Sequence, residues 1–344
     1  VRRFKAEFGP RVAVLHSQLS PGERYDTWRQ LRRGDQSVVI GARSAIFAPM
    51  VDLGIIVVDE EHDGSYKQED LEGRQALPYN GRDVALVRGK RENAVVVLGS
   101  ATPSLESYQN AQTGKYHRLS LPERIDSRPL PQVTVVDMHG EPFQRKRRAI
   151  FSRELRLKIR DRLDRKEKVV LLQNRRGFSP ILLCGSCGEA VECKRCRVTL
   201  TYHRQTGGEM RCHYCDFRGP IPTACDHCAA ADLQFEGIGT QQVEEALLEQ
   251  FPGVRVIRMD VDSTATKGSH DELVERFRSG DADILLGTQM VAKGLDFPEV
   301  TLVGVISADT SMHMPDFRAA ERSFQLLTQV AGRSGRGTTP GEVV

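Results

Sequence analysis

Short, continuous runs of apolar residues recur along the chain, separated by longer polar and mixed segments. Most of their members are β-branched and they do not alternate with polar residues, which is the pattern of parallel strands buried on both faces. We therefore predict strands at Val12–Leu15, Val38–Ile40, Ile55–Val58, Val95–Leu98, Val133–Val136, Val169–Leu172, Val254–Ile257, Ile284–Leu286 and Leu302–Ile306.

The segments between these runs carry the signals of helix ends. Ser20 and Glu23 form the pattern of a capping box, and Gly34 is placed to end the helix that follows. Thr240 is placed to cap a later helix. The apolar residues of that helix recur every four positions, at Val243, Leu247 and Phe251. Strands that alternate with helices predict an α/β fold.

A stretch rich in proline and charge divides the chain. Residues 119–150 contain four prolines and one expected strand, and otherwise have the composition of a linker. We expect one α/β lobe before this linker, at residues 1–118, and a second lobe after it. A cysteine-rich insert at 184–228 interrupts the second lobe, which is therefore formed by residues 151–183 and 229–344.

The bulk composition excludes several classes of protein. With 344 residues, of which 39% are hydrophobic, the chain can form two domains and a small third one. It contains neither an apolar run of about 18 residues nor a signal peptide, so we expect no membrane span and a cytoplasmic location. Because it does not begin with Met and ends in the strand-like GEVV, we expect a piece of a longer protein.

An acidic cluster follows the third expected strand. Asp59, Glu60 and Glu61 come directly after Ile55–Val58, at the carboxyl edge of a parallel sheet, where open α/β sheets bind ligands. In phosphoryl transfer, an Asp at this place holds Mg²⁺ and a neighbouring acid orients the attacking water. This pattern predicts Asp59 on the metal side and Glu60 on the water side. The alternative is a solvated acidic turn.

Polar motifs follow three further strands. Ser100 and Thr102 lie after one strand, and Gly287, Gly294 and their polar neighbours after another. Near the end of the chain, basic and amide side chains recur at spacings of four and three residues and can stabilise charge on a phosphoryl group. These are Gln329, Arg333 and Arg336. Together with the acid pair, the motifs indicate nucleotide chemistry.

All eight cysteines lie in four CxxC pairs between Cys184 and Cys228. Two CxxC turns supply the four thiolates of one tetrahedral zinc site, so the insert predicts two Zn²⁺ ions. Spacing alone leaves the pairing of the turns open, and redox or iron–sulfur centres are the alternatives. Basic and aromatic residues in or beside the insert suit single-stranded DNA or a protein docking face. They include Arg175, Arg176, Lys194, Arg211, Tyr202, Tyr214 and Phe217.

The order of the motifs DEEH, GSAT, GTQMVAKGLDF and QVAGRSGR resembles that of the superfamily 2 helicases. GARSAIFAP, DEEHDGSYKQ, NRRGF, the eight-cysteine insert and GIGTQQVEEAL are similar to the PriA family of primosomal replication-restart helicases. The resemblance implies two RecA-like parallel-sheet lobes with ATP between them, the second interrupted by a small two-zinc module. It also implies an ATP-dependent helicase that recognises stalled or repaired DNA forks, unwinds 3′ to 5′ and reloads the replicative helicase. The implied partners are primosome proteins and the single-stranded-DNA-binding protein.

The same resemblance assigns roles to residues of this chain. It implies that Asp59 holds Mg²⁺, that Glu60 acts on the water, and that Ser100 and Thr102 couple the ATP state to DNA. It places Gly294 and Asp296 near nucleotide and DNA, and Gln329, Arg333 and Arg336 on the ATP phosphates. It places an aromatic-rich loop between residues 65 and 83, with Tyr66, Lys67 and Tyr79 on DNA.

For the zinc ligands, the resemblance implies a nested arrangement. One site has the outer pairs Cys184, Cys187, Cys225 and Cys228, and the other has the inner pairs Cys193, Cys196, Cys212 and Cys215.

The acid pair lacks one expected counterpart in this sequence. The phosphate-binding loop GxxxxGK[ST] does not occur in it. We therefore expect the chain by itself to hydrolyse ATP poorly or not at all, and its parent to be an ATPase. The alternative function is a non-catalytic, zinc-containing DNA-binding or scaffold protein with a helicase-like body.

Overall fold

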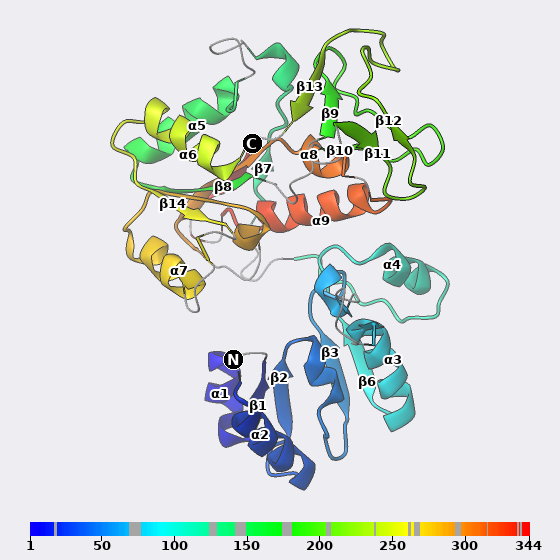
Figure 1. Ribbon diagram of the computed structural model, residues 1–344. Coiled ribbons are helices and arrows are strands. Elements are labelled where there is room, and N and C mark those ends of the chain that lie inside the picture. Colours follow the sequence, from blue (N-terminus) through cyan, green and yellow to red (C-terminus); the bar gives the residue numbers. More distant parts are fainter. Residues whose placement is uncertain are drawn as a thin grey trace. The chain divides into compact units, whose positions relative to one another are not determined.

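The chain forms two compact units, residues 1–118 and 119–344, and each is described by itself (Figure 1). The computed structural model describes residues 1–16, 19–68, 77–123, 129–141, 149–173, 181–203, 208–236, 239–260, 263–264, 269–292, 297–314, 316–335, 337 and 339–344.

A six-stranded, fully parallel sheet is the centre of the second unit. Its spatial order is β14-β15-β8-β16-β17-β7, with β8 between strands that come much later in the chain. The strands are β7 (Gln132–Val133), β8 (Lys168–Gln173), β14 (Val256–Met259), β15 (Ile284–Gly287), β16 (Val300–Ile306) and β17 (Glu342–Val343).

Helices cover both faces of this sheet (Figure 1). Alternate residues of β8 point to opposite sides: Val170 and Leu172 pack with α7 and α9, and Val169 and Leu171 pack with α5 and α6. The prediction of strands buried on both faces is therefore confirmed for β8, β15 and β16, whereas Val133 of the edge strand β7 is exposed. The helices are α5 (Arg153–Asp164), α6 (Thr240–Gln250), α7 (Ser269–Ser279), α8 (Asp309–Met312) and α9 (Ala319–Ala331).

Helix α6 begins one residue earlier than predicted. Its N-cap is Gly239, whose N–H donates to Oε1 of Gln242 at 3.0 Å. Thr240 is inside the helix, and its hydroxyl donates to Oδ2 of Asp260 at 2.8 Å instead of capping. The predicted apolar face is confirmed, since Val243, Leu247 and Phe251 are all buried.

Several predicted strands have different ends, and β16 begins at Val300, two residues before the predicted start at Leu302. β14 begins at Val256, two residues after the predicted start at Val254, and β7 is only Gln132–Val133. β7 comes from the segment with linker composition, yet it pairs in parallel with β17 at the edge of the sheet. Hydrogen bonding to a neighbouring strand, which sequence pattern does not report, decided this placement.

The cysteine-rich module is a separate antiparallel sheet within the second unit (Figure 1). Its order is β12-β11-β10-β9-β13, and β9 and β13 pair with each other, so the sheet extends beyond both ends of the insert expected at 184–228. The strands are β9 (Ile181–Cys184), β10 (Thr201–His203), β11 (Glu209–Arg211), β12 (Arg218–Gly219) and β13 (Leu233–Glu236).

The first unit contains two parallel strand pairs and one short ribbon. β1 pairs with β2, β3 pairs with β6, and β4 pairs with β5 in the antiparallel sense. The strands are β1 (Val12–Leu15), β2 (Val38–Gly41), β3 (Ile55–Val58), β4 (Lys67–Gln68), β5 (Tyr79–Asn80) and β6 (Val95–Leu98). The helices are α1 (Arg2–Phe8), α2 (Pro21–Arg33), α3 (Gly81–Glu92) and α4 (Leu105–Gln112).

The capping predicted for α2 is confirmed. The Ser20 side chain accepts from the N–H of Glu23, the Glu23 carboxylate accepts from the N–H of Ser20 at 2.8 Å, and Gly34 ends the helix with a left-handed φ of 81°.

The prediction of strands buried on both faces is wrong for β3 and β6. Helix α3 packs so closely on one face that a Cβ on Gly89 would lie 2.2 Å from a methyl carbon of Val96. The other face exposes Ile55, Val57, Val95 and Val97. No element in the described part of the chain covers that face, so only the face of β3 and β6 that packs against α3 is buried.

Candidate functional site

The acid pair lies where β3 ends. Asp59 follows Val58 directly and is exposed, with its Oδ1 accepting from the N–H of Glu60 at 3.1 Å. Glu60 has a positive φ of 49°, a conformation that costs a non-glycine residue on the order of 1 kcal/mol. The strand thus turns sharply at the second acid, which gives the two carboxylates different surroundings.

The acid-pair loop is bonded to the loop after β6. The N–H of Gly99 donates to the carbonyl oxygen of Val58 at 2.9 Å, and the N–H of Glu61 donates to that of Gly99 at 3.0 Å. Nδ1 of the buried His62 lies 2.6 Å from Oγ of Ser100, which also accepts from the N–H of Thr102 at 2.9 Å. The two sequence motifs DEEH and GSAT therefore form one hydrogen-bonded unit.

Glu61, which sequence reasoning left without a role, is buried beneath this unit. Its carboxylate accepts from the N–H of Ser104 at 2.7 Å, from the hydroxyls of Ser104 and Ser107, and from Arg82 at 3.1 Å. Burial alone would raise the pKa of Glu61, but these hydrogen bonds together lower it. Ser104 was the sequence feature that could have indicated a partner for Glu61, because it caps the next helix, α4.

Two polar atoms of the motif unit are buried without a hydrogen-bond partner. They are Oε2 of Glu60 and Oγ1 of Thr102. Buried polar atoms are normally paired, so these two atoms retain unused hydrogen-bonding capacity. Mg²⁺ takes oxygen ligands, usually one or two carboxylates together with phosphate. Asp59 and Glu60 fit this chemistry, with Asp59 as the candidate ligand.

Of the two tyrosines expected on DNA, Tyr66 contacts the acid-pair loop and Tyr79 does not. The phenol of Tyr66 donates to the carbonyl oxygen of Asp59 at 2.6 Å. Burial, and after it the charges of Asp59 and Asp63, raises the pKa of Tyr66, so the phenol keeps the proton that it donates. Lys67 is exposed in β4, whereas the Tyr79 ring packs against Phe47 with ring centroids 5.1 Å apart.

The candidate phosphate-binding residues of the second unit lie at the end of α9. Gln329 is in the last turns of the helix and Arg333 follows it, and both are half-buried. Between the arginines, Ser334 is fully buried and its hydroxyl donates to the carbonyl oxygen of Thr301 at 3.0 Å. The sequence analysis did not single out Ser334. A small polar residue between two arginines, in GRSGR, could have indicated it.

Five predicted residues lie outside the described part of the chain, namely Gly294, Asp296 and Arg336 of the nucleotide motifs and Arg175 and Arg176 beside the cysteine-rich insert. The approach of Gln329 and Arg333 to Asp59 and Glu60, which belong to the other unit, stays a prediction.

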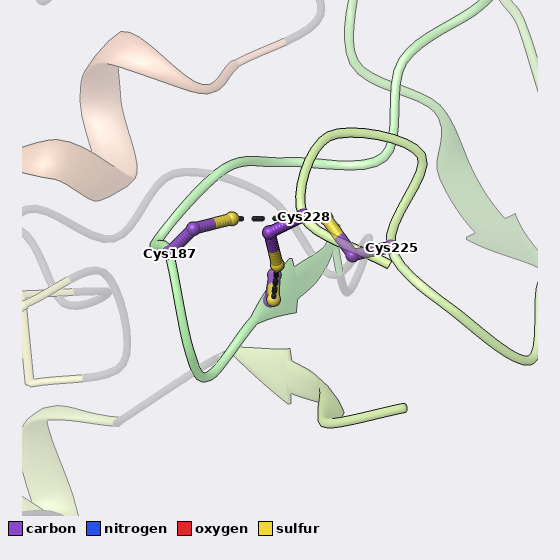
Figure 2. Close-up of side chains that lie close together, drawn as sticks. Cys187, Cys225 and Cys228 are labelled. Carbon is purple, nitrogen blue, oxygen red and sulfur yellow. Dashed lines mark hydrogen bonds between the residues drawn. The ribbon is translucent and has the colours of Figure 1, made fainter. Parts of the chain in front are cut away.

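The eight cysteines form two groups of four. One consists of Cys184, Cys187, Cys225 and Cys228, and the other of Cys193, Cys196, Cys212 and Cys215, which is the nested arrangement implied by the resemblance. Figure 2 shows how Cys187 approaches Cys225 and Cys228 from a separate loop. The Sγ atoms of Cys184 and Cys228 are 3.5 Å apart, and those of Cys187 and Cys225 are 3.7 Å apart. A tetrahedron with Zn–S bonds of about 2.3 Å has edges of about 3.8 Å, so both distances suit zinc.

All four CxxC turns have the same backbone hydrogen bonds. In each, the carbonyl of the first cysteine accepts from the N–H four residues later, and its own N–H donates to the carbonyl five residues later. The residue four positions after the first cysteine has a positive φ in every turn. These residues are Gly188 (80°), Arg197 (54°), Asp216 (57°) and Ala229 (61°). The chain therefore builds one metal-binding turn four times.

The thiols within a group cannot all ionise on their own. The N–H of Cys187 leads the hydrogen bonds that lower the pKa of Cys184 to about 6. The N–H of Glu189 acts to lower the pKa of Cys187, but burial and the neighbouring thiols raise it to about 12. Four thiolates in so small a space need a cation, which Zn²⁺ supplies. The donor set therefore fits two structural zinc ions.

Two segments of the chain match known protein families. Residues 236–338 match the family described as "Helicase conserved C-terminal domain", and residues 193–220 match "PriA DNA helicase Cys-rich region (CRR) domain". The second match contains all four inner cysteines.

Similarity to curated proteins extends over the whole chain. The chain is 52% identical over 344 residues to "Replication restart protein PriA" of Bacillus subtilis (strain 168), covering 100% of this chain and 42% of that protein. It is 48% identical over 349 residues to the protein of the same name from Synechocystis, covering 99% and 41%. The Haemophilus influenzae protein of that name is 42% identical over 344 residues, covering 100% and 46%. The chain thus spans less than half the length of these relatives.

Among the residues that the structure describes, none of the helices has both the length and the apolar character of a membrane span.

Proposed function

Because the chain belongs to the PriA family of replication restart proteins, we propose that its full-length protein is an ATP-dependent DNA helicase that acts at replication forks. The proposed activity includes unwinding in the 3′-to-5′ direction and assembly of the primosome with its protein partners. Asp59 would hold Mg²⁺ and Glu60 would orient the attacking water, while Gln329, Arg333 and Arg336 would contact the phosphates from the second lobe.

The contact between His62 and Ser100 is the observation that supports this proposal most directly. It joins the acid pair to the loop after the neighbouring strand at 2.6 Å, and Nδ1 of His62 is also 3.6 Å from Oε2 of Glu60. A change at Glu60 during hydrolysis can therefore reach Ser100 through two side-chain contacts, and Thr102 through the hydrogen bond that its N–H donates to Ser100. Helicases need such a path, because each ATP must be coupled to a movement on DNA.

The zinc module supplies a second supporting feature. Zinc would hold eight thiolates and order a sheet whose buried apolar core is small. The surface of the module exposes Lys194, Tyr214 and Phe217. Exposed cations and exposed aromatic rings on one module suit single-stranded DNA, because the cations can contact phosphates and the rings can stack on bases.

The isosteric substitution Glu60→Gln in the full-length protein tests the proposal. We expect DNA-stimulated ATP hydrolysis to fall by about 10²-fold or more, with DNA binding retained. Glu92→Gln, at the end of α3 in the same unit, is the control and should leave both unchanged. Full hydrolysis by the Glu60→Gln protein would contradict the proposal. The chain by itself, without a phosphate-binding loop, is expected to show little or no hydrolysis.

Duplexes with one single-stranded tail test the direction of unwinding. A 3′-to-5′ helicase should separate the strands from a 3′ tail, and efficient unwinding from a 5′ tail alone would contradict the proposed polarity.

The exposed basic and aromatic residues of the zinc module also favour the second candidate, a non-catalytic zinc-containing DNA-binding or scaffold protein. That candidate predicts salt-sensitive DNA binding by the full-length protein without any ATP hydrolysis.

A further inference from the structure

Two histidines of the cysteine-rich module meet edge to edge. The Nε2 atoms of His203 and His213 are 3.1 Å apart, whereas the centroids of their rings are 5.1 Å apart and the ring planes are tilted by 53°. The nitrogen edges of the two rings are therefore turned toward each other, and the rings do not stack. His213 is exposed and His203 is half-buried, so an ion can reach the pair from solvent.

The fold brings these two residues together from separate segments. His203 is the last residue of β10, which pairs with β11, and His213 is the second residue of the CxxC turn that follows β11. Cys212, directly before His213, is fully buried and belongs to the inner group of four cysteines. The N–H of Asp216 donates to the carbonyl oxygen of Cys212 at 3.0 Å and closes the turn. The backbone that carries His213 is therefore fixed by the inner site.

The distance between the two nitrogens suits a shared metal ion. Zn²⁺ binds histidine nitrogen at about 2.0–2.1 Å, which puts two nitrogens about 2.9 Å apart at a right angle and about 3.4 Å apart at the tetrahedral angle. The observed 3.1 Å lies between these values. Imidazole is a common ligand of Zn²⁺, Ni²⁺ and Cu²⁺, whereas Mg²⁺ and Ca²⁺ take oxygen ligands. The pair therefore favours a transition-metal ion.

The charged residues beside the pair leave room for a cation. Arg211, at the end of β11, is ion-paired with Asp216, with Nη2 and Oδ1 2.6 Å apart, and Asp216 also lies 3.5 Å from Arg218. The positive charge of Arg211 is thus balanced. In the described part of the chain, no third histidine, cysteine or carboxylate joins the pair in a group of metal ligands. An ion bound here would keep at least two coordination positions for water or an external donor, unlike an ion in a closed cysteine site.

We propose that His203 and His213 form a third metal site of the module, which binds one divalent transition-metal ion such as Zn²⁺ in addition to the two ions held by the cysteines. Because the site is open and has only two protein ligands, its ion exchanges with solvent and is held less tightly than the ions of the cysteine groups. The other explanation of the short distance is a hydrogen bond in which one neutral imidazole donates to the other. A hydrogen-bonded pair would bind no ion.

Titration of the full-length protein with Zn²⁺ tests the third site. Dialysis against metal-free buffer leaves the two cysteine-bound ions, which metal analysis checks. Isothermal calorimetry should then show further binding, with one ion per chain that depends on the pair. In His203→Ala and His213→Ala we expect the affinity for this ion to fall at least about 10-fold, because losing a ligand costs more than losing a contact that only supports one.

The matched control is His227→Ala. His227 is exposed in the fourth CxxC turn, as His213 is in the third, but its ring pairs with no other histidine among the described residues. The control should bind the third ion as the wild type does, and all three variants should keep two cysteine-bound ions.

Chemical modification of the wild-type protein tests the site without any substitution. Diethyl pyrocarbonate acylates accessible imidazole nitrogens, and peptide mass spectrometry reports the modification of each histidine separately. Added Zn²⁺ should protect His203 and His213 and leave the modification of His227 unchanged. If a substitution released the cysteine-bound zinc, this measurement would decide alone.

Both measurements can overturn the inference. A wild type that binds no further ion, or the same affinity in wild type, His203→Ala and His213→Ala, would show that the two rings are only hydrogen-bonded. Unchanged modification of His203 and His213 in the presence of Zn²⁺ would show the same. Neither measurement involves ATP hydrolysis or DNA, so a negative result leaves the proposed function intact.

Discussion

Three consecutive carboxylates at one strand end have three different environments. Asp59 is exposed, Glu60 occupies a left-handed conformation, and Glu61 is buried at 3% exposure with four hydrogen bonds. Their repulsion is relieved because one charge is turned inward toward Arg82 and two serines. The direction of the backbone thus gives chemically similar carboxylates different surroundings, one of them buried and bonded to Arg82 and the serines.

Removal of the buried carboxylate should destabilise the first unit. Glu61→Ala leaves Arg82 and the Ser104 N–H without their shared acceptor, at a cost of about 3 kcal/mol in the free energy of unfolding. Urea unfolding measures this change, with Glu92→Ala as the exposed control. A loss equal to that of the control would contradict the anchoring role.

The same site predicts a dependence on pH. The folded-state pKa of Glu61 lies below its ordinary value of 4.5, so the ionised carboxylate stabilises the fold above that pH. This stabilisation is lost as the pH falls below 4.5 toward the folded-state pKa. The difference in unfolding free energy between wild type and Glu61→Gln should therefore shrink from pH 7 to pH 3. A difference that is constant with pH would show that ionisation of Glu61 contributes nothing.

Between the candidate arginines, the fold requires a glycine at position 335. Gly335 has a φ of 69°, and a Cβ there would lie 2.6 Å from the backbone nitrogen of Gly341. Gly335→Ala should cost about 2 kcal/mol or more, since a left-handed alanine and a backbone clash add together. Gly253→Ala, with a φ of 84° and nothing within 4 Å of the added Cβ, should cost only about 1 kcal/mol. Equal costs in urea unfolding would contradict the clash.

Among the elements, the metal-binding turn shows most clearly how local sequence and geometry combine. Each CxxC is followed by a residue in the left-handed region, but only the first turn has glycine there, at Gly188. The other three turns accept this strain because the hydrogen bonds of the turn, and the metal when it is bound, hold the backbone.

Relief of that strain should stabilise the outer zinc site. Ala229→Gly gives the fourth turn the residue that the first turn already has, and should slow zinc release to a chelator by a few-fold, equivalent to less than about 1 kcal/mol. The reverse change, Gly188→Ala, should accelerate release to a similar extent. If Ala229→Gly released zinc faster, strain at this position would not be what limits the site.

At the scale of the whole molecule, the zinc module and the parallel sheet have separate hydrophobic cores. The sheet has two extended apolar clusters, one on each face. The module has only a small cluster around Leu182, Leu200 and Met210, in which two cysteines take part. Metal coordination must therefore supply much of the stability of the module, on the order of 10 kcal/mol for each structural zinc.

Zinc removal should unfold the module and leave the parallel sheet folded. Metal analysis should give two Zn²⁺ ions per chain, and chelation should remove exchange protection from residues 181–236 while β8 and β15 stay protected. Substitution of Cys184 and Cys187 by serine should reduce the content to one ion. One ion in the wild-type chain would contradict the two-site arrangement, and protection that survives chelation would show that the module has a sufficient core of its own.

What the sequence determined by itself was mostly local. Continuous β-branched runs, the capping box at Ser20 and the four CxxC pairs each depend on neighbours within a few residues, so the strands, the start of α2 and the number of metal-binding turns were predictable. The order of the motifs also indicated the family.

Only the tertiary structure decided how distant segments meet. Spacing left the cysteine pairing open, Val95 and Ile55 face outward despite an apolar pattern that predicts burial, and β7 joins a sheet from a segment with linker composition. Glu61 gained its anchoring contacts from partners at least 20 residues away in the chain. Such contacts depend on distances in the folded chain, and the pattern of residues along the sequence does not give those distances.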